Sequence, residues 1–580
     1  MPLRPFQLLG LLASAAVGLT GDTPKDGYCN GVPLSVSENN AKLPEHLVMS
    51  KCADFTLEEA TIAQMQKAME DGWLTSAKLV SCYLKRTFQT KPYLNSVMQE
   101  NPDVMDIAMD LDRERRCTGP RGPLHGIPFT VKDNIATNDL METTAGSWAL
   151  LGSRPHRDAT VVERLRKSGA VLFGKATMSE WADMRSSNYS EGYSPRGGQC
   201  RSAYNLTVNP GGSSSGSAVG VAANAIAFSI GTETDGSVIN PAMRNQIVGF
   251  KPTVGLTSRA GVIPESENQD SVGTFGRTVR DAVLPLDAIR GPDELDPMSE
   301  HQKKLKLPGG GFEELLSTKE ILVGANFGIP WDSFWTYTDT ETRRVLKGVV
   351  DLLRAKGANI HYMTEIKNHE RIVSPTGWDW DFGHDPEKNG TEGSEYTYIK
   401  VDFYNNLSDY LKKLRFSPMC SLEDIVNYNK RYSGTEGGFP QSHPAFYSGQ
   451  DGLEASLATK GLKDTKYHEA LNYRQNMARE GIDMALDYNG TQLNGLLVPL
   501  EPGQSYQIAA QAGYPMITLP AGVHQDSGMG IGLGIMQTAW KDDELVKWGS
   551  AIEDLMSSTE WKRTLPTWRG ALERNLPVPL

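Results

Sequence analysis

The chain of 580 residues lacks an apolar run long enough to cross a membrane. Its longest largely apolar run, residues 6–19, has 14 residues, and a helix of that length spans about 21 Å against a hydrocarbon core of about 30 Å. Arg4 precedes the run and small residues follow it. This pattern predicts a signal peptide over residues 1–20, cleaved between Ala15 and Gly21, and no membrane partner after cleavage. The alternative is a buried N-terminal helix.

Positive charge is also in short supply. The chain has 58 Lys and Arg against 70 Asp and Glu, a formal net charge of −12. A net negative charge disfavours binding to nucleic acid or to an anionic membrane surface. The simplest explanation of the net negative charge is that it keeps the protein soluble.

Metal and nucleotide motifs are missing as well. The ten histidines include no His-Glu-x-x-His pair, which disfavours a metallohydrolase. The glycine-rich stretch 211–216 lacks the Gly-Lys-Ser/Thr ending of a phosphate-binding loop. No metal or cofactor site is therefore predicted.

Cysteine is sparse, with six residues, all after residue 20. An even number after a signal peptide permits disulfides, and Cys29 with Cys52, in an N-terminal extension over residues 21–55, is the first pair we expect. For the other four cysteines, both disulfide bonds and ordinary buried thiols remain open. Secretion, and hence an extracellular location, also agrees with five glycosylation sequons, at Asn188, Asn205, Asn389, Asn406 and Asn489.

Alternating helix and strand patterns predict an α/β architecture with a largely parallel sheet. A capping signal at residues 56–59 precedes apolar spacings typical of a helix. Residues 129–131, 170–173, 226–230 and 321–324 read as strands. Residues 160–167 and 340–353 read as helices, and residues 249–253 as a turn.

The segment 211–253 is unusually rich in serine and glycine. It places three serines within five residues and a further glycine-flanked serine at Ser237. Glycine permits backbone conformations and close approaches that a Cβ would block. A site that brings backbone N–H groups to a reacting carbonyl needs that freedom.

Several ordered motifs resemble the amidase signature family of serine hydrolases. They are GPLHGIPFTVKDN (122–134), GGSSSGSA (211–218), GTETDGS (231–237), GVIPESENQDSVGTFGRTV (261–279) and AAQAGYPMITLPAG (509–522). GTETDGS is similar to the peptide amidase-like branch. The resemblance implies a single catalytic domain over residues 56–578, with a large, mixed, mostly parallel sheet flanked by helices (α/β/α).

The resemblance also implies the roles of individual residues. Ser237 is the nucleophile, Ser213 the bridging serine after a cis peptide bond, and Lys132 the base. The oxyanion hole is formed by backbone N–H groups at Thr234, Asp235, Gly236 and Ser237. Lysine acts as a base only when neutral, and a downward pKa shift of three units costs about 4 kcal/mol. The implied chemistry is hydrolysis of carboxylic amides through an acyl-enzyme, with no cofactor.

Three residues depart from the family pattern. Asp235 replaces a glycine, which places a carboxyl group beside the predicted oxyanion unless its side chain points away. Ile239 and Asn240 stand where other members have arginine and cysteine. These two changes put the neighbouring contacts in doubt, but not the triad.

The sequence also allows other enzyme classes and functions. Residues 212–216 also match the Gly-x-Ser-x-Gly elbow of α/β-hydrolases, but Asn209-Pro210-Gly211 interrupts the strand that the elbow needs, and His443, His468 and His524 lack distinctive contexts. An esterase or carbamate hydrolase on the same fold, a catalytically silent secreted binding protein and a tRNA-dependent amidotransferase subunit are further alternatives. The secretion signal and the acidic charge disfavour the last of these.

Residues 370–460 are irregular in pattern and rich in aromatic side chains. Such side chains pack a core or roof a substrate pocket, and the sequence leaves both open. The resemblance suggests small-molecule or peptide amides as substrates. Whether the chain forms a homodimer is also left open.

Overall fold

The computed structural model describes residues 28–29, 32–33, 45–304, 311–383, 393–570, 572 and 577–578. The predicted signal peptide, Asn389 and most of the 21–55 extension lie outside the described residues. At the extension, β1 (Tyr28–Cys29) pairs antiparallel with β2 (Val32–Pro33).

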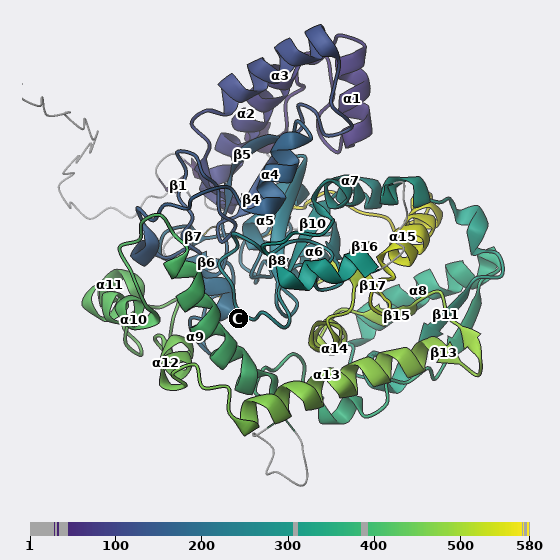
Figure 1. Ribbon diagram of the computed structural model, residues 1–580. Helices are drawn as coiled ribbons and strands as arrows, with labels where there is room; N and C mark the ends of the chain where they lie inside the picture. The colour runs from purple at the N-terminus through teal and green to yellow at the C-terminus, as the bar shows by residue number, and fades with distance from the viewer. Residues whose placement is uncertain are drawn as a thin grey trace, which may run out of the picture.

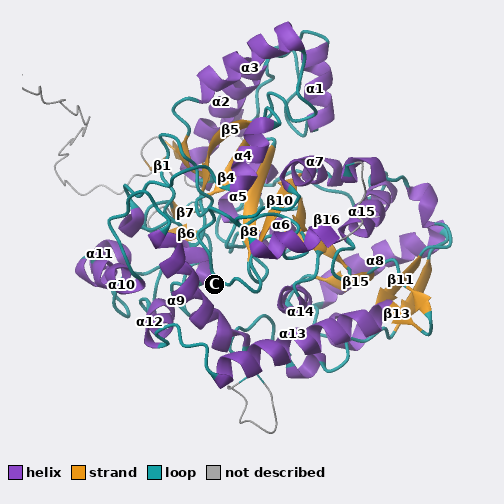
Figure 2. Cartoon of the chain, viewed as in Figure 1, coloured by secondary structure: helices purple, strands orange, loops and turns teal. Residues whose placement is uncertain are grey.

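One sheet of eleven strands runs through the molecule in the order β12-β11-β15-β17-β16-β9-β10-β8-β4-β5-β3, with helices around it (Figures 1 and 2). The strands are β3 (Val97–Glu100), β4 (Pro128–Lys132), β5 (Val171–Ala176), β8 (Phe228–Glu233), β9 (Val248–Lys251), β10 (Ser271–Gly276), β11 (Asn326–Ile329), β12 (Asn359–Tyr362), β15 (Leu496–Pro499), β16 (Met516–Val523) and β17 (Gly530–Met536).

The predicted mixed sheet with flanking helices is confirmed, but the emphasis on parallel pairing is corrected. Six neighbouring pairs are antiparallel, and four are parallel. Parallel pairs occur toward the two ends, where helices connect the strands, as in β4-α4-β5 and β11-α8-β12. In the centre β10 lies antiparallel between β8 and β9, which the local strand–helix pattern could not reveal.

The N-terminal helices form as their apolar spacing predicts, with one changed boundary. They are α1 (Ile62–Glu70), α2 (Ser76–Leu94), α3 (Val104–Thr118) and α4 (Thr160–Lys167). The capping box of α1 is Thr61 with Gln64, and not the predicted signal at residues 56–59. These helices lie at one end of the molecule (Figure 1).

Near the site the helices are α5 (Ser215–Ala222), α6 (Ile239–Arg244) and α7 (Val279–Ile289). The C-terminal part adds α8 (Thr340–Lys356), α13 (Thr465–Leu486), α14 (Gln504–Ala512) and α15 (Asp542–Met556). Two local predictions were wrong here. Residues 321–324, predicted as a strand, begin at the end of a 3-10 helix (Lys319–Leu322) ahead of β11, and residues 249–253, predicted as a turn, begin in β9. Both stretches are too short for periodicity to decide.

The 370–460 region is more helical than its sequence pattern indicated. It contains α9 (Glu395–Lys412), α10 (Leu422–Arg431), α11 (Ser433–Glu436) and α12 (Asp451–Ala458). Tyr398 and Phe403 of α9 belong to a buried cluster with Trp181. This local core is separate from the clusters on the sheet. Its packing stabilises helices that the weak apolar periodicity of the sequence did not predict.

Two larger apolar clusters hold the sheet. One joins β4, β5 and β8 to the N-terminal helices. The other joins β9, β11 and β15–β17 to α7, α8, α14 and α15. Lys132 ends β4 and Ser237 follows β8, so strands of the first cluster position both residues.

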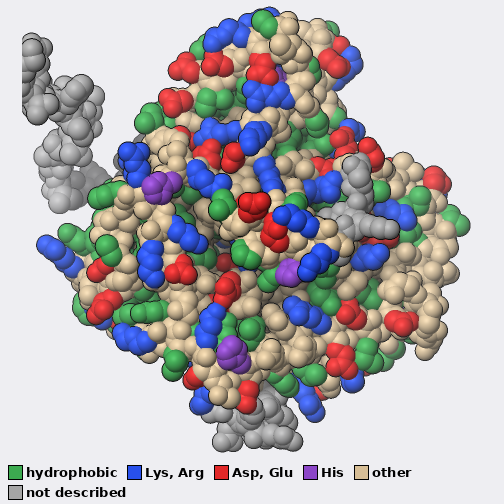
Figure 3. Space-filling model, viewed as in Figure 1, with side chains coloured by type: hydrophobic (Ala, Val, Ile, Leu, Met, Phe, Trp, Pro, Cys, Tyr) green, Lys and Arg blue, Asp and Glu red, His purple; other side chains and the backbone are tan. Residues whose placement is uncertain are grey.

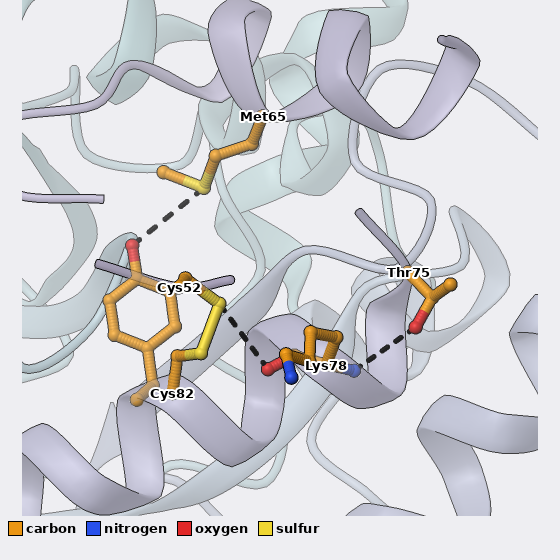
Figure 4. The surroundings of a disulfide bond; sticks show 6 residues. Cys52, Met65, Thr75, Lys78 and Cys82 are labelled. Carbon is orange, nitrogen blue, oxygen red and sulfur yellow. Dashed lines mark hydrogen bonds between the residues drawn. A yellow bond between two sulfur atoms is a disulfide. The ribbon is translucent and has the colours of Figure 1, made fainter. Parts of the chain in front are cut away.

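A disulfide joins Cys52 to Cys82 (Figure 4), which corrects the predicted Cys29–Cys52 pair. Helix α2 brings Cys82 beside the loop at Cys52, with a Cα–Cα distance of 5.7 Å, within the normal range for a disulfide. Cys117, Cys200 and Cys420 are free thiols.

Lys and Arg are interspersed with Asp and Glu over the face shown in Figure 3. The net negative charge is therefore not gathered into one patch on this face. Among the helices of the described ranges, none has both the length and the apolar character that crossing a membrane requires.

Candidate active site

Lys132 is the last residue of β4, which lies between β5 and β8 and is parallel to both. Its side chain is fully buried. Lys132 Nζ lies 2.8 Å from Ser213 Oγ and donates to the Thr232 carbonyl oxygen at 3.1 Å. The strand end therefore delivers the amine into the interior rather than to solvent.

Ser213 precedes α5, and the peptide bond between Gly212 and Ser213 is cis, as the resemblance implies. A Cβ on Gly212 would lie 1.9 Å from Glu191 Oε1. Only glycine fits at that position without displacing its neighbour. The packed loop presents Ser213 Oγ toward both Lys132 and Ser237.

Ser237 lies in the loop that joins β8 to α6 and is 4% exposed. Ser213 Oγ donates to Ser237 Oγ at 2.8 Å. Glu233 closes the loop, because its Oε2 accepts from the backbone N–H groups of Val238 at 2.6 Å and Ile239 at 2.9 Å. The three predicted residues thus form one continuous chain of hydrogen bonds from amine to hydroxyl to hydroxyl.

The environment of Lys132 favours its neutral form. Burial lowers the pKa of Lys132 from 10.5 to about 8, against an opposing effect from nearby carboxyl groups. A buried ammonium loses its hydration, which is the dominant physical cause. About a tenth of the amine is therefore uncharged at pH 7, far more than for a lysine with the ordinary pKa.

Four carboxyl groups around Lys132 were not identified from the sequence: Asp183, Glu265 and Asp270, which are buried, and Glu191, which is half-buried. Burial raises the pKa of each, for Asp183 and Glu265 well above the usual value. A raised pKa weakens each group as a counter-ion to an ammonium, although their charge still opposes the lowering of the Lys132 pKa. Glu265 and Asp270 lie in the motif at 261–279 and could have been noticed, whereas Asp183 and Glu191 carry no sequence signal.

The loop before Ser237 offers unused donors. The backbone N–H groups of residues 234–237 donate no hydrogen bond to any described part of the chain. The loop is held by other atoms: Thr234 Oγ1 donates to Asp270 Oδ1 at 2.6 Å, and the Thr234 carbonyl accepts from Gln269 Nε2 at 3.2 Å. A positive φ of 83° at Gly236 adds a turn that favours glycine. This row of donors can face a developing oxyanion.

The Asp235 side chain points away from that row. Its Oδ2 accepts a hydrogen bond from Trp378 Nε1. Burial, with a smaller contribution from Glu395, raises the pKa of Asp235 well above its usual range. The raised pKa favours the neutral acid, and the contact with Trp378 holds the carboxyl group, so the departure from the family glycine is accommodated.

The alternative elbow nucleophile, Ser214, donates to the Thr232 carbonyl at 3.0 Å. No described histidine hydrogen-bonds to Ser213, Ser214 or Ser237. His443 pairs with Tyr193, and His524 with Thr342 and Glu341. A Ser-His arrangement is therefore absent from the described part of the site.

A cavity of about 360 Å³ lies next to this centre and is lined by Asp183, Trp378, Trp380 and Tyr396, among others. The aromatic side chains of the 370–460 region therefore serve both purposes that the sequence left open: Tyr398 and Phe403 pack a core, and the others wall a cavity. A larger cavity of about 660 Å³ lies elsewhere, lined by Arg277, Arg280 and Arg563 among others, and neither cavity is lined by Lys132, Ser213 or Ser237. The smaller cavity is tied to the site through Asp183 and through the hydrogen bond from Trp378 to Asp235.

Comparison with known proteins identifies the family. The family described as Amidase matches residues 78–413, more than half of the chain. The chain belongs to the amidase family. A Schizosaccharomyces pombe protein named "Putative amidase C869.01" is 53% identical to this amidase over 537 residues, covering 91% of this chain and 90% of that protein.

Solved structures agree with the family. The peptide amidase from Stenotrophomonas maltophilia is 37% identical, with a TM-score of 0.76, and the match covers 88% of this chain and 99% of that one. An amidase family protein from Bacillus anthracis is 30% identical, with a TM-score of 0.77 and coverage of 88% and 93%. The predicted amidase signature fold is confirmed. This amidase is an amidohydrolase, a hydrolase that acts on amide bonds.

Proposed function

We propose that Ser237 is the nucleophile of this amidase and that hydrolysis proceeds through an acyl-enzyme. The observation that carries the proposal is the chain of contacts from Lys132 Nζ through Ser213 Oγ to Ser237 Oγ, with two links of 2.8 Å. A hydroxyl needs a base to become an effective nucleophile. Neutral Lys132 is that base, and Ser213 relays the proton.

In the first step Ser237 Oγ bonds to the amide carbonyl carbon while its proton passes to Ser213 Oγ. The Ser213 proton passes to Lys132 Nζ, which becomes an ammonium. The tetrahedral intermediate then breaks its C–N bond, and the amine leaves with a proton returned through the same relay. Water repeats the sequence on the ester to release the carboxylic acid and free Ser237.

Stabilisation of the oxyanion is assigned to the unused backbone donors at residues 234–237. Each such donor contributes about 3–4 kcal/mol to transition-state stabilisation when its geometry is good. Because these donors lie in the loop that carries Ser237, nucleophile and oxyanion hole form one rigid unit.

Similarity to a peptide amidase supports peptide amides as the substrate class, alongside small linear amides. The cavity beside Trp378 supplies room for a group attached to the reacting amide.

The test combines labelling with trapping. A fluorophosphonate should modify Ser237, identified by mass spectrometry of the labelled peptide, and Ser237→Ala should abolish labelling. Ser217→Ala is the matched control, because its Oγ bonds only the Ile230 carbonyl at 3.2 Å, and it should still label. Hydroxylamine added during amide turnover should yield a hydroxamate. Labelling at another residue, or hydrolysis with no hydroxamate formed, would contradict the proposal.

Secretion is part of the proposal. The Cys52–Cys82 disulfide supports an oxidising compartment. Asn188 and Asn489 are exposed, so both can accept a glycan, whereas the amide nitrogen of Asn406 is buried and that of Asn205 donates to the Ser527 carbonyl. Protein collected from the medium of a eukaryotic host should lose mass on glycosidase treatment. Retention inside the cell with no glycan would contradict it.

A further inference from the structure

The cavity beside the relay has an aromatic wall. Tyr189, Trp378, Trp380 and Tyr396 line it. Trp380 and Tyr396 are stacked, with ring centroids 5.9 Å apart and planes at 12°, and Trp378 lies 5.2 Å from Trp380. Aromatic faces of this kind attract organic cations through their quadrupoles.

The wall already holds one cation. Lys400 Nζ lies 5.2 Å from the centroid of the Tyr396 ring. Lys400 does not line the cavity, and no Lys, Arg or His is among the described residues that do. The interior of the cavity thus has no positive charge of its own.

Carboxyl groups line the same space. Asp183, Asp379, Asp381 and Asp451 contribute to it. Asp379 and Asp381 are exposed at its edge, and Asp451 accepts from the Ser187 backbone N–H at 2.9 Å. Asp183 Oδ1 is buried and has no hydrogen-bond partner among the described residues. A buried acceptor without a donor is a site that a ligand N–H can satisfy.

Two contacts tie this cavity to the reacting centre. Trp378 Nε1 donates to Asp235, two residues before Ser237. Tyr189 Oη donates to Glu191 Oε2 at 3.5 Å, and Glu191 lies against Gly212, next to Ser213. A substrate whose carbonyl reaches Ser237 can therefore extend a side group into the cavity.

We propose that this cavity binds a cationic group of the substrate, so that the favoured substrates are amides that carry a guanidinium or ammonium group. The aromatic faces attract the cation, and the carboxyl oxygens accept its N–H bonds. This inference rests on the proposed function, because it assumes that Ser237 is the reacting group.

The experiment compares two nearly isosteric substrates, Nα-acetyl-argininamide and Nα-acetyl-citrullinamide, which differ in charge. Release of ammonia gives kcat/KM for each. We expect the arginine amide to be favoured at least tenfold, and the ratio to fall at least threefold in Asp379→Asn/Asp381→Asn. Asp54→Asn/Asp106→Asn, which neutralises two exposed carboxylates away from the cavity, should keep the wild-type ratio.

A second variant, Trp380→Leu, removes an aromatic face and should also lower the ratio; its circular dichroism and fluorophosphonate labelling report whether it is folded. A wild-type ratio near one, or a preference that survives both variants, overturns the cation subsite while leaving the acyl-enzyme in place. Loss of fluorophosphonate labelling at Ser237 in the wild-type protein would instead overturn the proposed function.

Discussion

The relay and the adjoining cavity are built in opposite ways. Lys132, Ser213 and Ser237 are held in a buried loop system at the ends of β4 and β8, with every link fixed by hydrogen bonds. The cavity wall is half-buried, aromatic and drawn from a region that packs on its own small core. Chemistry depends on a rigid, dry centre, whereas selectivity is assigned to a more exposed surface that contacts the centre through the hydrogen bond from Trp378 to Asp235.

The largest expected effect tests whether the buried amine is special to the relay. Lys132→Ala should lower kcat/KM by roughly 10³-fold, because general-base catalysis contributes 10²–10⁴. The control is Lys175, another fully buried lysine, whose pKa burial also lowers to about 8. Lys175 Nζ donates to the Ile135 carbonyl and Thr143 Oγ1 rather than to a catalytic serine.

Lys175→Met should therefore destabilise the fold by about 1–3 kcal/mol, since it leaves buried acceptors unpaired, while kcat of the folded enzyme stays within a few-fold. Urea unfolding and amide turnover measure the two effects. If Lys132→Ala kept more than a tenth of the activity, the relay would be the wrong mechanism.

The second effect is pH dependence. The base must be neutral, and the pKa of Lys132 is lowered to about 8. Below that pH the amine is protonated, so kcat/KM should fall tenfold per pH unit, to about a hundredth at pH 6, and level off above pH 8. A pH–rate profile from 5 to 10 checks this, and a flat profile between pH 6 and 8 would contradict it.

A smaller effect tests the bond between the two regions. Trp378→Phe keeps an aromatic ring but removes the donor to Asp235. One lost hydrogen bond contributes about 1 kcal/mol, so kcat/KM should fall about 3–10-fold. Trp331→Phe, on a tryptophan that stacks on Trp335 away from the cavity, should have no such effect. Equal kcat/KM values for the two variants would show that the hydrogen bond between Trp378 and Asp235 does not contribute to turnover.

The smallest effect on turnover is expected at the disulfide. Cys52 and Cys82 are separated by 30 residues, and removing a cross-link over such a loop costs about 3–4 kcal/mol in the chain-entropy account. Cys52→Ser/Cys82→Ser should lower stability to denaturant by that amount and leave kcat unchanged. Cys117→Ser, on an exposed free thiol, should change neither. A large loss of kcat in the folded double variant would show that the N-terminal helices act on the site.

Much of the centre could be predicted because its backbone demands particular residues. Gly212 and Gly236 are required by close contacts with Glu191 and Tyr506, and such requirements leave recognisable motifs. The carboxyls around Lys132 were harder to find: Glu265 and Asp270 lie in a recognised motif with no sign that they face Lys132, and Asp183 and Glu191 come from a stretch without a pattern. The disulfide partner and the antiparallel centre of the sheet were missed for the same reason: both depend on which distant segments meet.

The sequence alone identified the fold family through motifs that resemble it, and the same resemblance pointed to the three residues that we propose as the relay. Glycine and serine patterns leave such motifs because the local backbone conformations need those residue types. Only the tertiary structure decided that Asp235 turns toward Trp378, that burial brings the pKa of Lys132 near neutrality, and which aromatic side chains wall the cavity. Burial and long-range contacts arise from packing. Packing brings together residues that are far apart in the sequence, and their sequence separation does not predict their distance in space.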